Sequence, residues 1–227
     1  METLDRTGTT PARPGLRELK KQRTRAALLR AAYTLFIERG YDSTTVDAIV
    51  EAVGVSQRTF FRYYSGKEHV ALGVQEMAME HFYEAVRARP PQEPPLEAMR
   101  RAVLEGWETV HETIECVVPV EQYLGMYRVI ESTPVLLAAH LRRSAQTEER
   151  FARLIAEREG LDVDADPRPR VVVAVFGGVM RVTERLWSAG EDHSVDSMRA
   201  ITVEYLDQVG PALAGNWRDT RGGPACP

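Results

Sequence analysis

The chain has 227 residues, of which 44% are hydrophobic and 27% are charged, enough for a small domain joined to a larger one. No stretch approaches the roughly 18 to 20 apolar residues of a membrane span, and the polar start lacks the apolar region of a signal peptide. We therefore expect a soluble, cytoplasmic protein that contacts no membrane. Cys116 and Cys226 are too few for a disulfide framework or a four-ligand zinc site, and we expect free thiols.

Charge is distributed unevenly along the chain. From Arg13 to Lys67 there are 11 basic and 5 acidic side chains, whereas from Glu68 onward there are 17 basic and 26 acidic ones. The net charge of -4 therefore hides a basic N-terminal part. This pattern is typical of a DNA-binding region followed by an acidic part that phosphate would repel, with chance as the alternative.

The first predicted helix follows a polar N-terminal segment. Residues 1–15 carry Gly, Thr and Pro without apolar periodicity, which predicts a disordered arm. A helix is predicted over 16–39, because apolar residues recur at the spacing of one helix face and Gly40 follows as a C-cap. The residues of this face are Leu28, Ala31, Ala32, Leu35 and Phe36.

Two short helices joined by a tight turn are predicted next. Thr44 and Asp47 have the spacing of a capping box, which opens a second helix. Gly54 interrupts the apolar pattern, and Ser56 is a suitable N-cap for a third helix over 57–64. Two short helices with such a turn form a helix-turn-helix.

The rest of the chain continues the helical pattern without strand alternation or an internal repeat. Further helices are predicted over 67–88, 96–112, 120–131, 134–159, 170–189 and 194–213, with the proline-rich segment 90–95 as a linker. We therefore expect an all-α fold. Its domains would be a three-helix head over 16–66 and a larger helical body over 67–213, followed by a flexible tail over 214–227.

The third helix has two chemically different sides. Because a helix advances about 100° per residue, Phe60 and Tyr64 share one side, and Arg58 and Arg62 share the opposite one. The aromatic rings are expected to pack inward. Arginine can hold guanine O6 and N7 with two hydrogen bonds, which favours contact with the major groove of DNA. A solvated helix pair without a ligand is the alternative from these residues alone.

The N-terminal part contains five segments in unbroken register: TRAALLRAA (24–32), LFIERGYD (35–42), TTVDAI (44–49), AVGVSQRTFFRYY (52–64) and SGKE (65–68). Together they resemble the DNA-binding domain of the TetR/AcrR family of transcriptional regulators. The resemblance implies a head that binds DNA and a helical body that binds a ligand and dimerises. It also implies repression that ends when a small molecule enters the body.

The resemblance further implies DNA contacts at particular positions. Thr44 or Thr45 would contact phosphate, the groove would be faced by Gln57, Arg58, Thr59 and Phe61, and Tyr63 and Lys67 would bind the backbone, with Arg62 in either role. Phe61 stands where the family often has a tyrosine that reaches DNA, and Arg58 where it often has a small residue. The base preference of relatives therefore does not transfer to this chain.

The last two helices of the body are expected to form a homodimer interface. Residues 170–189 are similar to the penultimate helix of many such regulators, which implies a four-helix interface within 170–213. Gly177-Gly178 would allow close approach of two helices, with chance placement as the alternative. Since a two-fold protein matches a palindromic site, the expected partner is double-stranded DNA with a palindromic operator.

A small-molecule site is expected among the helices of the body. Aromatic and methionine side chains with a few polar tips gather over 107–130, around a helix break at Pro119, and suit an apolar cavity. The candidate lining residues are Phe82, Trp107, His111, Tyr123, Met126, Tyr127, Phe176 and Met180. Ordinary core packing is the alternative for each of them.

The sequence carries none of the common motifs of hydrolases, dinucleotide or phosphate sites, or zinc proteases. His111 and Cys116 are spaced so that their side chains diverge on a helix. We therefore expect no catalysis, no cofactor and no metal. The predicted function is that of a homodimeric repressor released from its operator by an apolar or amphipathic effector. The alternative is a ligand-blind dimeric DNA-binding module controlled by protein level or a protein partner.

Overall fold

The computed structural model describes residues 16–115 and 117–214, and every regular element within these ranges is an α-helix. The helices are α1 (Leu16–Arg39), α2 (Val46–Val53), α3 (Gln57–Phe61), α4 (Lys67–Ala71), α5 (Gly73–Arg87), α6 (Pro95–Glu115), α7 (Val120–Ser132), α8 (Pro134–Glu159), α9 (Arg168–Ala189), α10 (Val195–Asp207) and α11 (Val209–Ala214). The predicted all-α fold is confirmed. None of the described helices has the length and apolar character of a membrane span. The predicted arm, the tail beyond residue 214 and both cysteines lie outside the described residues.

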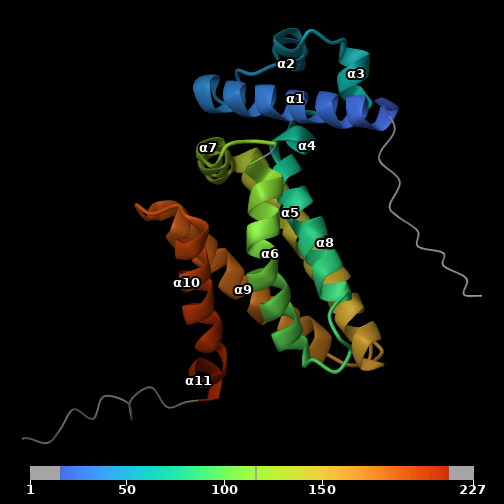
Figure 1. Ribbon diagram of the computed structural model, residues 1–227, viewed down its shortest axis with the longest axis vertical. Coiled ribbons are helices and arrows are strands. Elements are labelled where there is room, and N and C mark those ends of the chain that lie inside the picture. Colours follow the sequence, from blue (N-terminus) through green and yellow to red (C-terminus); the bar gives the residue numbers. More distant parts are fainter. Residues whose placement is uncertain (1–15, 116, 215–227) are drawn as a thin grey trace, which may run out of the picture.

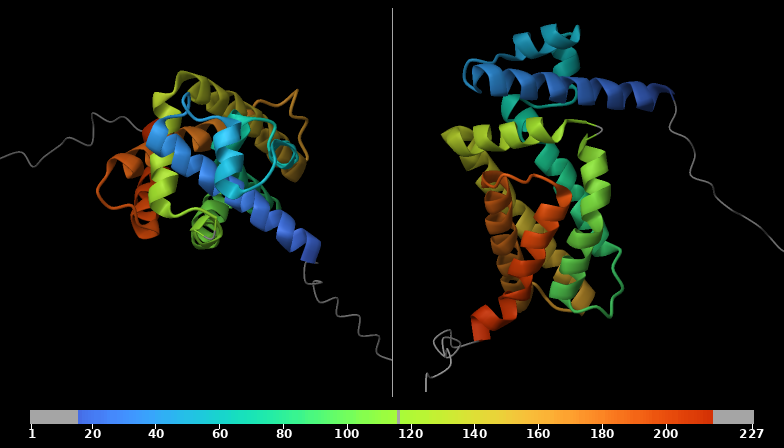
Figure 2. Two further views of the ribbon diagram at one scale, coloured as in Figure 1. Left: turned by 90° about the horizontal axis from the view of Figure 1, so that it is seen from above. Right: turned by 60° about the vertical axis from the view of Figure 1, so that its left-hand side comes forward.

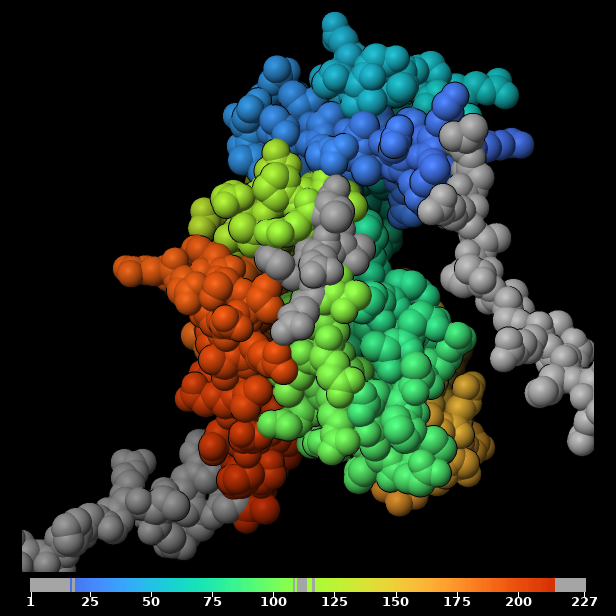
Figure 3. Space-filling view, viewed as in Figure 1, coloured from blue at the N-terminus to red at the C-terminus, as the bar shows by residue number. Residues whose placement is uncertain are grey.

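The helices form a small head at one end of a larger body (Figures 1 and 2). In the head, α1 lies across the end of the body, with α2 and α3 on its outer side, and α7 crosses beneath α1. In the body, α5 packs against α6, and α9 packs between α8 and α10. The space-filling view shows that α2 and α3 form the outermost surface of the head, opposite the body (Figure 3). The helix-turn-helix is therefore accessible from outside.

Local caps determine the ends of α2 and α3. Thr45 is the N-cap of α2, and its hydroxyl oxygen accepts a hydrogen bond from the amide of Ala48 at 3.1 Å. Ser56 caps α3 in the same way, through the amide of Thr59 at 3.2 Å. Between the two helices Gly54 adopts φ 71°, a left-handed conformation that favours glycine. These three residues produce the predicted helix-turn-helix.

Two details of the head differ from the sequence prediction. The prediction that Thr44 caps α2 is wrong. The hydroxyl of Thr44 is buried and donates to the carbonyl oxygens of Gly40 at 2.9 Å and Leu35 at 3.2 Å. Thr45 takes its place one residue later. The helix α3 ends at Phe61 rather than near Tyr64, so the third helix is shorter than predicted.

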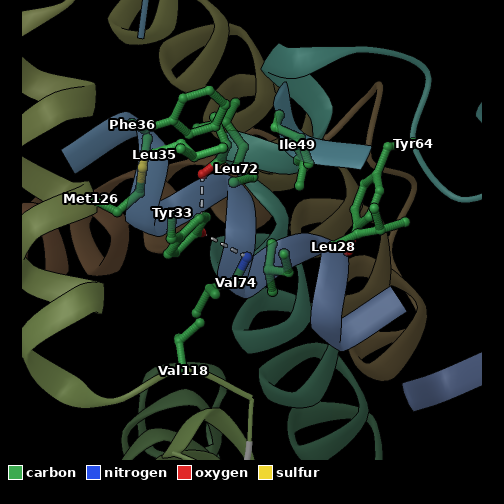
Figure 4. Packing of buried hydrophobic residues seen from close by; sticks show 14 of the residues in the cluster. Leu28, Tyr33, Leu35, Phe36, Ile49, Tyr64, Leu72, Val74, Val118 and Met126 are labelled. Carbon is green, nitrogen blue, oxygen red and sulfur yellow. Dashed lines mark hydrogen bonds between the residues drawn. The ribbon is translucent and has the colours of Figure 1, made fainter. Parts of the chain in front are cut away.

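The predicted helix over 67–88 is instead two helices, α4 and α5, which break at Leu72. The hydroxyl of Tyr33 on α1 donates to the carbonyl oxygen of Ala71 at 3.0 Å and accepts from the amide of Val74 at 3.3 Å (Figure 4). It therefore satisfies backbone groups that a helix break exposes. A Cβ at Gly73 would lie 2.9 Å from the side chain of Leu29, so glycine allows α1 to approach here. This break depends on a tertiary contact.

The predicted last helix over 194–213 is also two helices, α10 and α11. Pro211 explains the break, because its ring lacks an amide hydrogen and clashes with the carbonyl four residues earlier, that of Asp207. α10 ends at Asp207, with Gln208 as its C-cap. The helix predicted over 96–112 continues to Glu115, three residues beyond its predicted end. The helix α8 ends at Glu159 as predicted, with Gly160 as its C-cap at φ 65°.

The main hydrophobic core joins the head to the body. It contains buried residues of α1 to α4 together with Met126 on α7 and Leu136 on α8 (Figure 4). The two parts approach closely at Gly125, where a Cβ would lie 2.9 Å from the side chain of Ile37 on α1. A second core cluster lies within the body and includes residues of α5, α6, α8 and α9. Elements on both sides of the predicted boundary at residue 66 thus share one core.

Candidate DNA-binding surface and ligand cavity

Two buried aromatic residues hold α3 and the turn after it against α1. Phe60 is fully buried and Tyr64 is 1% exposed, and their ring centroids are 5.8 Å apart. The Tyr64 hydroxyl donates to the carbonyl oxygen of Arg25 at 3.1 Å. This side of the third helix therefore packs inward, as the sequence analysis expected.

The opposite side of α3 is exposed. Gln57, Arg58 and Arg62 are exposed, and Phe61 has 53% of its surface exposed. Within the described part of the chain, the Arg58 side chain has no hydrogen-bonding or ionic partner, so its five donors are available. The Phe61 ring packs edge-on against Phe60 with centroids 5.3 Å apart, which fixes an apolar group on the outer surface.

Other candidate DNA-contacting side chains already have partners in the head. The Gln57 amide donates to the carboxylate of Asp47 on α2. The guanidinium of Arg62 donates to the hydroxyl of Tyr63 at 3.2 Å and lies 5.0 Å from its ring centroid. The Thr59 hydroxyl lies 3.1 Å from that of the N-cap residue of α3. These contacts align the outer surface before any ligand is present.

The two threonines before α2 have different environments. Thr44 is 1% exposed and its hydroxyl donates to two carbonyl groups inside the head. Thr45 is exposed and lies at the N-terminus of α2, where unpaired amides can hold an anion. Of these two candidates for a phosphate contact, the geometry therefore favours Thr45.

Lys67 lies at the junction of head and body. Its ammonium group donates to the carbonyl oxygens of Tyr41 at 2.9 Å and Thr44 at 2.7 Å, and it lies 4.4 Å from the ring centroid of Tyr41. Two of its three donors therefore hold the segment between α1 and α2. This environment differs from that of a lysine extended toward a phosphate group.

The body contains a cavity of about 280 Å³. It is lined by side chains of the main body helices, and five of the predicted ligand-binding residues are among them: Phe82, Trp107, Tyr123, Phe176 and Met180. At one end the rings of Phe82 and Phe176 stack with centroids 5.4 Å apart and an interplanar angle of 11°. Phe151 adds a third ring, with its centroid 4.9 Å from that of Phe82. The cavity thus has an aromatic end.

The structure places Met126 and Tyr127 away from the cavity. Met126 is fully buried in the core that α7 shares with the head, and Tyr127 is also buried. Neither side chain lines the cavity. The helix α7 crosses beneath α1 (Figure 1), and its residues Val120 and Tyr123 line the cavity. The side chain of His111 lies outside the described part of the structure.

Polar residues that the sequence analysis missed also line the cavity. Glu184 accepts a hydrogen bond from the Tyr123 hydroxyl at 2.8 Å, and burial raises the pKa of the Glu184 carboxyl above its usual value. Burial lowers the pKa of His140, and nearby Arg181 adds to the effect. Glu184 follows Met180 by four residues, so helical spacing alone would have placed it on the same side.

Comparison with known proteins is consistent with both parts of this architecture. Residues 28–74 match the sequence model described as bacterial regulatory proteins, tetR family, and residues 93–214 match that of the MftR C-terminal domain. The chain is 43% identical over 212 residues to the HTH-type transcriptional regulator TcmR of Streptomyces glaucescens, covering 93% of this chain and 94% of TcmR.

Solved structures show the same fold. A transcriptional regulator from Aquifex aeolicus VF5 superposes with a TM-score of 0.53 at 14% identity, covering 82% of this chain and 99% of that one. NalD of Pseudomonas aeruginosa gives a TM-score of 0.50 at 18% identity, covering 84% and 96%. At these identities the likeness concerns the fold alone.

Proposed function

Because the chain belongs to the TetR family of bacterial transcriptional regulators, we propose that two copies bind a palindromic operator as a repressor and leave it when an effector fills the body. The observation that carries the DNA-binding part is the outer side of α3. It presents Arg58 and Phe61 to solvent while Phe60 and Tyr64 hold the helix against α1. The protein would act in the cytoplasm, where its DNA is.

The proposed DNA contacts divide by chemistry. Arg58 is the candidate for a bidentate contact with guanine, and Phe61 for an apolar contact with a thymine methyl. Thr45 at the N-terminus of α2 and Tyr63 are candidates for phosphate contacts, which position the head without specifying sequence. Gln57 and Thr59 lie on or beside the same surface and complete the groove-facing set.

The proposed homodimer uses the exposed apolar side of α9 and α11. Val171 is 59% exposed, Leu186 is 43% exposed and Leu213 is 73% exposed, although all three are large and apolar. Gly178 lies between the first two along α9, and a Cβ there would meet no atom within 4 Å in the described part of this chain. Such a stripe supports burial against a second copy.

The cavity supports effector control over the ligand-blind alternative. Small-molecule sites usually enclose roughly 300 to 1,000 Å³, so about 280 Å³ is near the lower end of that range. A body that only dimerised would need no such space. An effector releases DNA only if it binds one arrangement of the two heads more tightly than the other.

The proposal is tested by selecting bound sequences from a random DNA pool with the full-length protein. We expect a palindromic consensus. Arg58→Ala should weaken binding to it by about 1 to 3 kcal/mol per half-site and relax the preference at one symmetric position. Arg87→Ala, which removes an exposed arginine at the far end of α5, is the matched control. Failure to enrich a palindrome, or an unchanged preference in Arg58→Ala, would contradict the proposed DNA contacts.

A further inference from the structure

The wall of the cavity contains polar atoms that have no partner. Both the nitrogen and the oxygen of the Gln75 side-chain amide are buried without a hydrogen bond, and so is the indole nitrogen of Trp107. Both residues line the cavity, from the neighbouring helices α5 and α6. Nearly all buried polar groups in proteins are hydrogen-bonded, so three unpaired atoms in one cavity wall indicate unused capacity for a ligand.

The charged groups of the wall are already paired. Arg143 forms an ion pair with Glu76, and Arg181 pairs with Glu148 at 2.5 Å. An anionic ligand would have to displace a carboxylate from one of these arginines. Glu184 is bound by Tyr123, and its burial disfavours the ionised form that a cationic ligand would require.

The apolar part of the cavity favours flat rings over flexible chains. The stacked rings of Phe82 and Phe176, with Phe151 beside them, offer faces and edges for a further aromatic ring. The polar capacity at Gln75 and Trp107 requires oxygen or nitrogen atoms on such a ligand. A saturated hydrocarbon chain would leave all three polar atoms buried and unpaired.

We infer that the effector is an uncharged aromatic compound bearing hydroxyl or carbonyl groups, and that Gln75 and Trp107 select it by hydrogen bonding to those groups. The Trp107 indole donates to an acceptor on the ligand, and the Gln75 amide both donates and accepts. This inference rests on the proposed effector control and specifies its chemistry.

The test uses four probes that share one ring system: 2-naphthol, naphthalene, 2-naphthoate and 2-naphthylmethylammonium. Calorimetric titration of the full-length dimer should show 2-naphthol binding about tenfold more tightly than naphthalene, which corresponds to roughly 1.4 kcal/mol. The anion and the cation should bind more weakly than 2-naphthol. If a charged probe binds most tightly, if naphthalene equals 2-naphthol, or if no probe binds, the inference is wrong.

Three variants test the two named residues. Gln75→Leu and Trp107→Phe remove the polar atoms while keeping an apolar side chain, and each should reduce the preference for 2-naphthol over naphthalene severalfold. Met180→Leu, which changes an apolar lining residue, should keep it. Gln75→Leu should also raise the melting temperature of the empty protein, because it removes a buried unpaired amide. An unchanged preference in both polar variants would overturn the assignment.

Operator binding measured with each probe separates this inference from the proposed function. Release of DNA by 2-naphthoate or by the cation, but not by 2-naphthol, would retain effector control and overturn the ligand class. If calorimetry shows that a probe binds but no such probe changes operator affinity, effector control itself is contradicted. Binding of 2-naphthol that also lowers operator affinity supports both.

Discussion

Lys67→Met should destabilise the protein without changing the salt dependence of DNA binding. The methionine keeps the length of the side chain but removes the ammonium group that donates to the carbonyl oxygens of Tyr41 and Thr44. Hydrogen bonds from charged groups are each worth about 1.5 to 3 kcal/mol. Because Lys67 is half-buried and water can reach the freed carbonyls, we expect a loss of about 2 kcal/mol for the pair.

The assay for this prediction has two parts. Two kcal/mol should lower the melting temperature by roughly 4 to 8 °C for a chain of this length. Lys20→Met, an exposed lysine on α1, is the control and should leave the melting temperature unchanged. Below the melting temperature, operator affinity is then measured over a salt series, where each lost phosphate contact reduces the slope by about 0.9.

Two outcomes would refute this role for Lys67. Suppose that Lys67→Met has the melting temperature of the wild type and that its salt slope falls by the amount expected for one lost phosphate contact per head. The ammonium group then binds phosphate in the complex. The hydrogen bonds to Tyr41 and Thr44 would then belong only to the free protein. A stable variant with an unchanged slope would also contradict the expected stabilisation.

Two further predictions concern stability and assembly. Tyr33→Phe should lower the free energy of unfolding by about 1 to 3 kcal/mol, because it leaves the buried amide of Val74 unpaired. The control Tyr205→Phe, at an exposed tyrosine, should leave it unchanged. Urea unfolding measures the free energy of both variants. Leu186→Glu on the exposed side of α9 should shift the protein toward the monomer in equilibrium sedimentation. The control Val135→Glu on α8 should not. A dimer that survives Leu186→Glu would place the interface elsewhere.

The helices were predictable wherever a local signal defines them. Gly40 and Gly160 follow helices that end where predicted, and Ser56 caps α3, because capping depends on neighbouring backbone groups. The break at Leu72 was not predictable in this way, since it depends on the hydroxyl of Tyr33, about 40 residues earlier. The break before α11 had a local signal in Pro211 that the periodicity over 194–213 outweighed.

The two sides of α3 were easier to predict than the lining of the cavity. The sides of α3 follow from helix geometry, so Phe60 inward and Arg58 outward needed no tertiary information. The cavity depends on how separate helices meet. Met126 is a suitable cavity residue by type, but α7 directs it into the core shared with the head. Gln75 carried no signal, because a buried unpaired amide can be recognised only when its neighbours are known.

A chain of contacts leads from the cavity wall to the turn that follows α3. Arg143 pairs with Glu76, and both line the cavity. The other carboxylate oxygen of Glu76 lies 3.2 Å from Nε2 of His69. Nδ1 of His69 accepts from the amide of Ser65 at 3.1 Å, which leaves Nε2 as the donor to Glu76. The His69 ring also packs edge-on against Tyr64, with centroids 5.4 Å apart.

This arrangement predicts that Glu76→Gln uncouples the cavity from the head while leaving both able to bind. The amide keeps the size of the side chain but loses the charge that joins Arg143 to His69. The operator affinity of the empty protein should change little, whereas the loss of affinity caused by 2-naphthol should shrink. Couplings of this kind are typically about 1 to 3 kcal/mol, which operator titrations with and without the probe can resolve.

Position on a path of contacts is not by itself proof of coupling, so the test needs a matched variant and a cycle. The matched variant is Glu80→Gln. Glu80 lies one turn further along α5, away from the head, and accepts a hydrogen bond from Arg150 at 2.6 Å that this substitution weakens. It should leave the effect of the probe unchanged. The double variant Glu76→Gln/His69→Gln should reduce the effect of the probe on operator affinity by less than the sum of the two single reductions. The difference should be at least about 0.5 kcal/mol. If Glu80→Gln reduces the coupling as much as Glu76→Gln does, or if the double variant is additive, the signal passes instead through the packing of α7 against α1 around Gly125.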